Sequence, residues 1–345
     1  MKIENPAIPF NSIVVIIGAN GYIGTETCEK FLQAGYRVRG TVRDVEKHQA
    51  WMHNLFDDKY PGKFELVRVV DFEADDGFDK AFEGAAGVVY VSTPIIFDPD
   101  PANVVDPVVK GIINTLNSAV RAGVKRYVLC SSSKAVEATV YNQPHEISTE
   151  TYNHEDLRKA YEEPTVATTE RALSVYSASR VAAELAFWSW VKENNPPFVA
   201  NCIVLDGNFG RVLRAEKIQG SSVGMLKRVL AGNWNDVLTH LAYIVNVEDS
   251  ARLMVAAATL SSIVNERIFA YYKQATWNEL RHKIRQLYPD RLDLVSGEDL
   301  DLEGRDMSNA DGPIKRAEEI LKGLGQSGFM SVDDTLRDLV DTFCS

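Results

Sequence analysis

The sequence has few cysteines, and nothing in their placement joins them. No two of them form a Cys-x-x-Cys pair. The four lie far apart along the 345 residues: Cys28, Cys130, Cys202 and Cys344. We therefore expect free thiols in a reducing compartment, and neither a disulfide scaffold nor a cysteine zinc site. His48 and His53 are too loosely spaced for a zinc pair, so we expect them on a solvated helix face and predict no metal site.

Long apolar runs and an excess of basic residues are also lacking. No run approaches the roughly 18 residues of a membrane span, and residues 1–11 lack the apolar core of a signal peptide. Lys plus Arg number 37 against 48 for Asp plus Glu, a net charge of −11. A nucleic-acid partner is not expected, because phosphate binding needs a basic face. We predict a soluble, cytoplasmic protein in which any anionic ligand meets a local positive pocket.

The composition, 45% apolar and 25% charged residues, is that of a globular protein with one large domain or two modest ones. Over the first 130 residues, short β-branched runs alternate with helical stretches. The runs lack polar alternation, which is typical of strands buried on both faces: 12–17, 37–42, 64–70, 88–91 and 127–130. The stretches between them end at glycine or proline, as helices do: 22–34, 45–59, 75–82 and 104–122. The pattern predicts an α/β fold with a doubly wound parallel sheet of the Rossmann type.

After this region the alternation continues and then weakens. A helix over 176–193 stops at an Asn-Asn-Pro-Pro breaker, and a strand over 198–205 follows. Beyond it mainly helical stretches stand out: 223–231, 247–260, 276–287, 313–323 and 332–343. We predict a dinucleotide-binding domain over 1–205 and a smaller, mostly substrate-binding cap over 206–345, with about 244–272 returning to the main domain.

Two loops are expected near a ligand. The Pro/Asp-rich loop 94–107 follows the fourth predicted strand at the carboxyl edge of the sheet, where ligands of such folds bind. The polar stretch between Ser133 and Tyr176 shows little periodicity and is long for a connection. We expect the first to line a cleft and the second to form a lid over the substrate.

A glycine-rich loop joins the first predicted strand to the first predicted helix. It reads Gly18-Ala19-Asn20-Gly21-Tyr22-Ile23-Gly24. Its amides and the helix N-terminus would face a pyrophosphate. The alternative is a tight turn without a ligand, but the buried strand before, the helix after and the second strand ending about 20 residues on favour a dinucleotide.

The end of the second strand indicates which dinucleotide. Arg43 stands where an NAD-specific protein commonly has a carboxylate, and Lys47 follows one helical turn later. Two cations favour a 2′-phosphate, so we predict NADP(H) over NAD(H). Asp44 either turns towards a ribose hydroxyl or caps the following helix; the second role fits its position beside Arg43.

Two further motifs lie at predicted carboxyl edges. Ser131-Ser132-Ser133 ends the fifth strand, and Tyr176-Ser177-Ala178-Ser179-Arg180 opens a long helix, with Tyr176 and Arg180 four apart on one face. With the glycine loop, these residues resemble the extended short-chain dehydrogenase/reductases, in the branch of dihydroflavonol reductases, cinnamoyl-CoA reductases and microbial NADPH-dependent aldehyde/ketone reductases. The likeness also includes five other runs: 38–44, 69–72, 91–94, 128–133 and 243–249.

The resemblance implies roles for individual residues. Ser133 would orient a substrate carbonyl, and Tyr176 would donate a proton to the developing alkoxide, helped by a nearby cation. Asp71 and Phe72 would hold the adenine, and Thr93 would line the nicotinamide side. Ser222, in a segment that opens a helix, would also touch the cofactor. The complete set of implied cofactor contacts is Gly18, Gly21, Tyr22, Ile23, Gly24, Arg43, Lys47, Asp71, Phe72, Thr93, Tyr176, Arg180 and Ser222.

The chain departs from the family pattern at two positions. Arg180 replaces the family's lysine; it keeps the positive charge beside Tyr176 but cannot release a proton, so a relay through a lysine amine is broken. Asp206 stands where the family usually has proline near the nicotinamide carboxamide. Substrate or cofactor orientation is expected to differ there.

These observations predict NADPH-dependent reduction of a medium-sized aldehyde or ketone, by a monomer or homodimer. One alternative is a lyase, isomerase or cyclase that reuses the pocket with NADP(H) bound, which Arg180 makes plausible. A second is a cofactor-binding sensor without chemistry, against which Ser133 and Tyr176 argue. A third is a hydrolase with Ser222 as nucleophile, because 220–224 match Gly-x-Ser-x-Gly; no buried strand precedes that motif, and a capping serine is the better interpretation.

Overall fold

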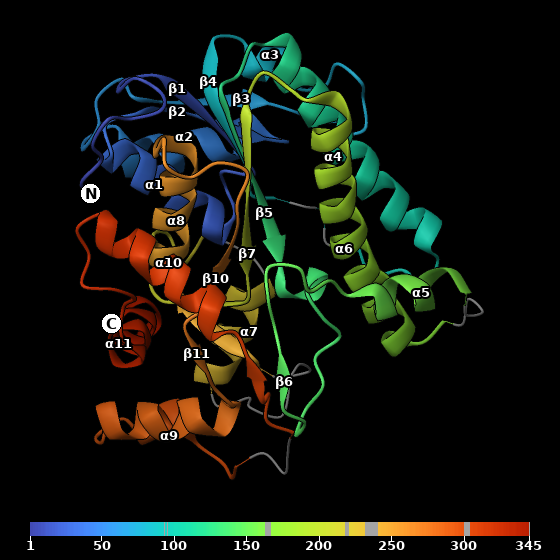
Figure 1. Ribbon diagram of the computed structural model, residues 1–345. Coiled ribbons are helices and arrows are strands. Elements are labelled where there is room, and N and C mark those ends of the chain that lie inside the picture. Colours follow the sequence, from blue (N-terminus) through green and yellow to red (C-terminus); the bar gives the residue numbers. More distant parts are fainter. Residues whose placement is uncertain are drawn as a thin grey trace.

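The computed structural model describes residues 1–92, 94, 96–162, 167–217, 221–231, 241–299 and 304–344. A seven-stranded sheet lies at the centre (Figure 1). Its strands are β1 (Ile13–Ile17), β2 (Arg37–Val42), β3 (Phe64–Arg68), β4 (Ala85–Tyr90), β5 (Arg126–Ser132), β7 (Val199–Leu205) and β10 (Arg267–Ala270). They run in the order β3-β2-β1-β4-β5-β7-β10, and every neighbouring pair is parallel. This confirms the predicted doubly wound α/β class.

Helices cover both faces of the sheet, and each face has its own buried apolar cluster. One face carries α1 (Tyr22–Gln33), α2 (Val45–Phe56), α8 (Val247–Thr259) and α10 (Asp311–Gly323). The other carries the short α3 (Asp79–Phe82), α4 (Val105–Arg121) and α6 (Thr169–Asn194). Burial on both faces explains why the strands read as continuous apolar runs without polar alternation. Short 3-10 turns η1 (Pro101–Asn103), η2 (Ser133–Ala135) and η4 (Leu292–Val295) lie between these elements.

Charged side chains hold α1 against α8. Lys30 on α1 pairs with Glu26 at 3.2 Å and with Glu248 of α8, and Arg211 pairs with Glu26 at 2.7 Å. Glu26 and Lys30 are 1% and 2% exposed. Buried charges are tolerated only when paired in this way. The network fixes α1, whose N-terminus faces the glycine loop.

The C-terminal region forms a second, smaller sheet from β8 (Gly207–Phe209), β9 (Tyr243–Asn246) and β11 (Lys273–Gln274). The helices that pack with it are α7 (Ser221–Leu230), α9 (Trp277–Leu287) and α11 (Val332–Cys344), which lie below α1 in Figure 1. Between β9 and β11 the chain returns to the main sheet as α8 and β10. The division into a nucleotide-binding and a cap domain at residue 205 stays a prediction. Among the described helices, none combines the length and apolarity that crossing a membrane requires.

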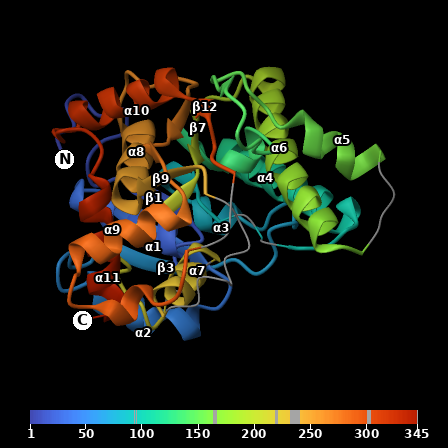
Figure 2. The same cartoon turned by 90° about the horizontal axis from the view of Figure 1, so that it is seen from below.

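The helix expected over 75–82 is only Asp79–Phe82, and three elements in and before α6 also differ from the sequence-based expectations. Helix α6, which carries Tyr176, begins at Thr169 and not at Tyr176. Thr168 caps it by accepting a hydrogen bond from the backbone N–H of Arg171 at 3.1 Å. The stretch before it contains α5 (His154–Glu162), which packs against α6 and lies beside it in Figure 2. It also contains β6 (His145–Glu146), paired in parallel with β12 (Ser308–Asn309). The stretch therefore contains regular structure, and its role as a lid over the substrate stays a prediction.

The close contact at Gly24 generates a stability prediction. A Cβ at this position would lie 2.1 Å from the carbonyl oxygen of Gly18, which is backbone and cannot move cheaply. We expect Gly24→Ala to lower the free energy of unfolding by about 1–3 kcal/mol, as overpacking does, measured by chemical denaturation. Gly323→Ala is the control, because nothing lies within 4 Å of an added Cβ there. Equal stability of the two variants would contradict the packing argument.

Candidate active site

The predicted site segments meet at one edge of the main sheet. The glycine loop follows β1, the loop from Ser92 follows β4, Ser133 follows β5 in η2, and Asp206 follows β7. Since all four strands are parallel neighbours, their carboxyl ends share that edge. In open α/β sheets this is the ligand-binding edge.

The glycine loop packs too tightly for side chains. Gly18 has a φ of 81°, in the left-handed region, and a Cβ on it would lie 2.0 Å from the Cβ of Ser92. Gly21 is the N-cap of α1 and offers no side-chain cap, so backbone amides form this end of the helix. Tyr22 is buried and donates a hydrogen bond from its hydroxyl to the carbonyl of Gly210 at 3.2 Å, and Ile23 is half-buried. The loop therefore has the shape and the donors that a pyrophosphate requires.

At the end of β2, the acidic residue caps a helix and the two basic residues are exposed to solvent. Asp44 Oδ1 accepts a hydrogen bond from the backbone N–H of Lys47 at 3.1 Å, so Asp44 is the N-cap of α2. Arg43 and Lys47 are both exposed. The capping role considered for Asp44 is thus the one that the structure shows, and two cations remain at the surface beside the glycine loop.

His48 contacts the glycine loop, which the sequence did not indicate. Its Nδ1 accepts from Trp51 Nε1 at 3.2 Å, and its Nε2 lies 3.2 Å from the side-chain amide of Asn20. Burial, and then the charge of Lys47, lowers the pKa of His48 and favours the neutral ring. His48 is therefore half-buried against the glycine loop, and His53, which is also half-buried, pairs with Asp57 at 2.8 Å.

The adenine residues implied by the resemblance lie after β3. Asp71 is exposed and its Oδ1 accepts from the backbone N–H of Glu73 at 2.8 Å. Phe72 packs on α4, where a Cβ at Gly111 would lie 2.4 Å from its ring. Asn114 donates to the carbonyl of Glu73 at 2.8 Å and so fixes the same turn. Contact of Asp71 and Phe72 with adenine stays a prediction.

Two implied cofactor residues cannot be placed by their side chains. Thr93 lies outside the described residues. Ser222 lies in the first turn of α7, which begins at Ser221, and its side chain is also outside the described part. The hydrolase-like motif 220–224 is likewise only partly described, so the roles assigned to Ser222 stay predictions.

Ser133 is paired with Asp206. Its hydroxyl is 2.9 Å from Asp206 Oδ1, and Asp206 Oδ2 accepts from the backbone N–H of Tyr243 at 2.8 Å. Burial raises the pKa of Asp206, and nearby Asp306 adds to the increase; the bonds from Ser133 and Tyr243 and the charge of Lys134 oppose it. The carboxyl group of Asp206 therefore takes up a proton more readily than that of an ordinary aspartate.

Tyr176 and Arg180 lie on one face of α6. The guanidinium carbon of Arg180 is 4.5 Å from the centroid of the Tyr176 ring. Arg180 Nη2 donates to the carbonyl of Pro94 at 2.5 Å, while its buried Nε has no hydrogen-bond partner within the described chain. Because α6 packs against η2, the helix brings Tyr176 to the side of the sheet edge where Ser133 lies.

Phe97 is a residue of the site that sequence reasoning missed. Its ring lies 5.2 Å from that of Tyr176, centroid to centroid, although the side chain is 58% exposed. Arg171 on α6 also donates to the carbonyl of Pro99 at 3.2 Å. Phe97 and Pro99 thus lie along α6, and the one signal in the sequence was an aromatic residue in the Pro/Asp-rich loop.

Comparison with known proteins agrees with this geometry. Residues 14–269 match the model of the NAD dependent epimerase/dehydratase family. The chain belongs to this family of extended short-chain dehydrogenase/reductases. It is 32% identical to aldehyde reductase 2 of Sporidiobolus salmonicolor, with 98% of each chain covered. It is 30% identical to the ketoreductase nvfG of Aspergillus novofumigatus, over 96% of this chain and 97% of the relative.

A solved structure shares the fold. Yeast methylglyoxal/isovaleraldehyde reductase, complexed with NADPH, superposes with a TM-score of 0.78 at 20% identity, covering 96% of this chain and 98% of the other. The protein is therefore an enzyme-family member with an NAD(P)-binding fold, and its reductase relatives span nearly its whole length.

The Asp206 environment generates a prediction about stability and pH. Since the pKa of Asp206 is raised in the folded protein, the folded state binds more protons than the unfolded state above the ordinary carboxyl range of about 4. Stability then falls as pH rises through the folded-state pKa, by at most about 1.4 kcal/mol per pH unit. Asp206→Asn removes this contribution, so the wild-type and variant curves of unfolding free energy should converge at low pH and separate at higher pH. Parallel curves would contradict the argument.

Proposed function

We propose that the protein reduces an aldehyde or ketone to an alcohol, with a hydride from NADPH and a proton from Tyr176. The observation that supports the proposal is that the glycine loop after β1 and Ser133 after β5 lie at the same edge of the sheet, and that α6, which carries Tyr176, packs against η2, which begins at Ser133. The names of the reductase relatives support the reaction class. The substrate class is a medium-sized carbonyl compound that lies between η2, α6 and the loop 94–107.

The chain's own residues account for the proton and the charge. When bound, the nicotinamide supplies the hydride. The Ser133 hydroxyl orients the carbonyl oxygen, and the Tyr176 phenol protonates it as negative charge develops. Arg180, with its guanidinium over the Tyr176 ring, stabilises the tyrosinate that remains. Its guanidinium does not release a proton, so Tyr176 is reprotonated by a route that does not pass through Arg180.

Asp206 acts as a positioning residue for Ser133. The Ser133 hydroxyl has one proton, and a charged Asp206 takes it in the 2.9 Å hydrogen bond. A protonated Asp206 instead donates to Ser133 Oγ, which leaves the serine proton for the substrate oxygen. The raised pKa of Asp206, caused first by burial, favours this second arrangement.

The cofactor preference follows from the end of β2. Asp44 is engaged as the N-cap of α2, so it is not the ribose-binding carboxylate of NAD-specific proteins. Arg43 and Lys47 are exposed beside the glycine loop and supply the two cations that a 2′-phosphate would meet.

A second candidate function rests on Arg180. This residue donates to the carbonyl of Pro94 and carries no proton that it can release at physiological pH. A lyase, isomerase or cyclase needs no relay of that kind and would use the same pocket with NADP(H) bound. The experiments below separate the two functions.

The Arg43 prediction concerns affinity. We expect the protein to bind NADPH at least about tenfold more tightly than NADH, because charge-assisted bonds to the 2′-phosphate are absent for NADH. Arg43→Ala should remove most of this preference in calorimetric titrations. Lys80→Ala, which removes an exposed cation on α3, is the control and should keep it. Equal affinity of the wild type for both cofactors would overturn the assignment.

The Tyr176 prediction tests the reaction itself. Tyr176→Phe should lower turnover of a carbonyl panel, followed by NADPH absorbance, by about 100-fold or more, because general acid catalysis contributes at least that much. NADPH affinity should stay within a few-fold, since the hydroxyl acts on transition-state charge. Ser133→Ala should weaken turnover less, and Tyr161→Phe, an exposed tyrosine on α5, should not change it. Normal turnover in Tyr176→Phe would make the non-redox function the leading one.

The Arg180 prediction separates charge from proton relay. Arg180→Lys should keep cofactor binding and give equal or higher reductase activity, whereas Arg180→Met should lose both, because only methionine removes the cation beside Tyr176. Steady-state kinetics and cofactor titrations measure the two effects. A lysine variant that gains carbonyl reduction absent from the native protein would support the non-redox function, and full activity of Arg180→Met would contradict the charge argument.

A further inference from the structure

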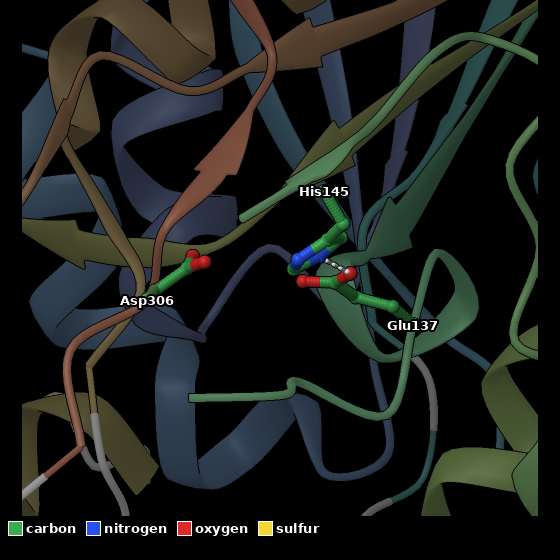
Figure 3. A group of neighbouring side chains, drawn as sticks. All are labelled: Glu137, His145 and Asp306. Atoms are coloured by element: carbon green, nitrogen blue, oxygen red, sulfur yellow. Dashed lines mark hydrogen bonds and ion pairs between the residues drawn. The ribbon is translucent and has the colours of Figure 1, made fainter. Parts of the chain in front are cut away.

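Three potential metal ligands meet where two distant segments of the chain run side by side. Glu137 and His145 lie between η2 and α5, and Asp306 precedes β12. One ligand atom from each lies within 4.8 Å of the other two. Figure 3 shows His145 between the two carboxylates, with the hydrogen bond to Glu137 drawn.

The backbone holds these three residues together. β6 and β12 pair in parallel, with His145 opposite Ser308, and Tyr141 forms an isolated bridge with Asp306. The segments approach so closely that a Cβ on Gly304 would lie 2.1 Å from the Cβ of Tyr141. The cluster is therefore a fixed feature of the fold and does not depend on chance contacts of flexible side chains.

The histidine is oriented as metal-binding histidines are. His145 Nδ1 lies 2.9 Å from the backbone carbonyl of Gln143, and since a carbonyl only accepts, Nδ1 carries a proton. The other nitrogen, Nε2, is 2.6 Å from Glu137 Oε2, inside the cluster. A backbone carbonyl that fixes the tautomer in this way is typical of the outer shell of metal sites.

Asp306 provides independent evidence for a cation. The residue is 2% exposed, and its Oδ1 accepts from the backbone N–H of Ser308 at 2.8 Å. Its buried Oδ2 has no hydrogen-bond partner among the residues that the structure describes. A buried carboxylate oxygen left unpaired costs about 1–3 kcal/mol or more, and a cation at the centre of the cluster would remove that cost.

We propose that Glu137, His145 and Asp306 bind one divalent first-row transition-metal ion, with Zn²⁺ as the best fit. One imidazole nitrogen and two carboxylate oxygens, with no thiolate, suit such ions, and three protein ligands leave a fourth position for water. Metal–ligand bonds of about 2.1 Å place tetrahedral ligand atoms about 3.4 Å apart. Binding therefore separates His145 from Glu137, draws Asp306 inward and displaces the proton that His145 and Glu137 share, which is released to solvent.

The ion would act as a clamp between the two segments. It would join the stretch that follows the active-site turn η2 to the stretch that leads into β12 and α10. The charge of Asp306 also contributes to the raised pKa of Asp206, the partner of Ser133. The inference does not rest on the proposed reductase activity, because metal binding and stability test it directly.

The test uses full-length protein treated with a chelator and then titrated with Zn²⁺ alone in a calorimeter. We expect one saturable site per chain, a higher unfolding temperature with Zn²⁺, and a weaker effect of Mg²⁺, which prefers oxygen ligands and retained water. Co²⁺ in place of Zn²⁺ should give the visible absorption of a low-coordinate site. Absence of a one-to-one site for both Zn²⁺ and Co²⁺ would overturn the proposal.

Variants locate the site. His145→Gln and Glu137→Gln should each weaken Zn²⁺ binding at least about tenfold and reduce the thermal shift. His282→Gln is the matched control, because His282 Nε2 also lies 2.7 Å from a carboxylate, Asp299, but that pair is exposed and outside the cluster. Asp306→Asn tests the third ligand. If this variant fails to fold, His145→Gln and Glu137→Gln decide whether Zn²⁺ binds at the cluster. Binding that survives in both His145→Gln and Glu137→Gln would show an adventitious surface ion and contradict the assignment.

Discussion

A buried ion pair between Glu184 and Arg267 joins the parts of the molecule that carry the site. Glu184 on α6 is fully buried and Arg267 on β10 is 8% exposed, with Nε 2.5 Å from the carboxylate. The same carboxylate accepts from Ser131 Oγ of β5 at 2.5 Å and from Trp188 Nε1 at 3.3 Å. Since both charges are desolvated, loss of either partner would leave an unpaired buried charge, which costs about 3–5 kcal/mol.

The position of this pair explains the geometry of the site. Tyr176, Arg180 and Glu184 follow one another at intervals of four residues on α6, so fixing Glu184 fixes the face that carries the other two. Ser131 lies two residues before Ser133 on the same strand end. Arg267 also donates to the carbonyls of Thr149 and Thr151, which ties down the stretch before α5. One buried ion pair thus fixes the relative positions of α6, the end of β5 and the stretch before α5.

The sequence predicted what depends on local periodicity. The strand–helix units and the glycine loop were predictable because apolar runs, glycine stops and the Gly18–Gly24 spacing are local signals. The sequence does not indicate the start of α6, because its cap, Thr168, lies in a polar stretch with little periodicity. Contacts between segments far apart in sequence, such as Ser133 with Asp206 or His145 with Asp306, leave no periodic trace. His48 was assigned to a solvated face because nothing in the sequence shows that Asn20 lies against it.

The central claim is that NADPH, bound at this edge of the sheet, transfers a hydride to the carbonyl carbon of the substrate. The most direct measurement uses NADPH labelled with deuterium at the reactive ring carbon and a panel of medium-sized aldehydes and ketones, with products analysed by mass spectrometry and NMR. The account predicts one deuterium on the new alcohol carbon, from one face of the nicotinamide, with NADPH consumed mole for mole. Products that form without deuterium, while the cofactor is unchanged, would contradict it.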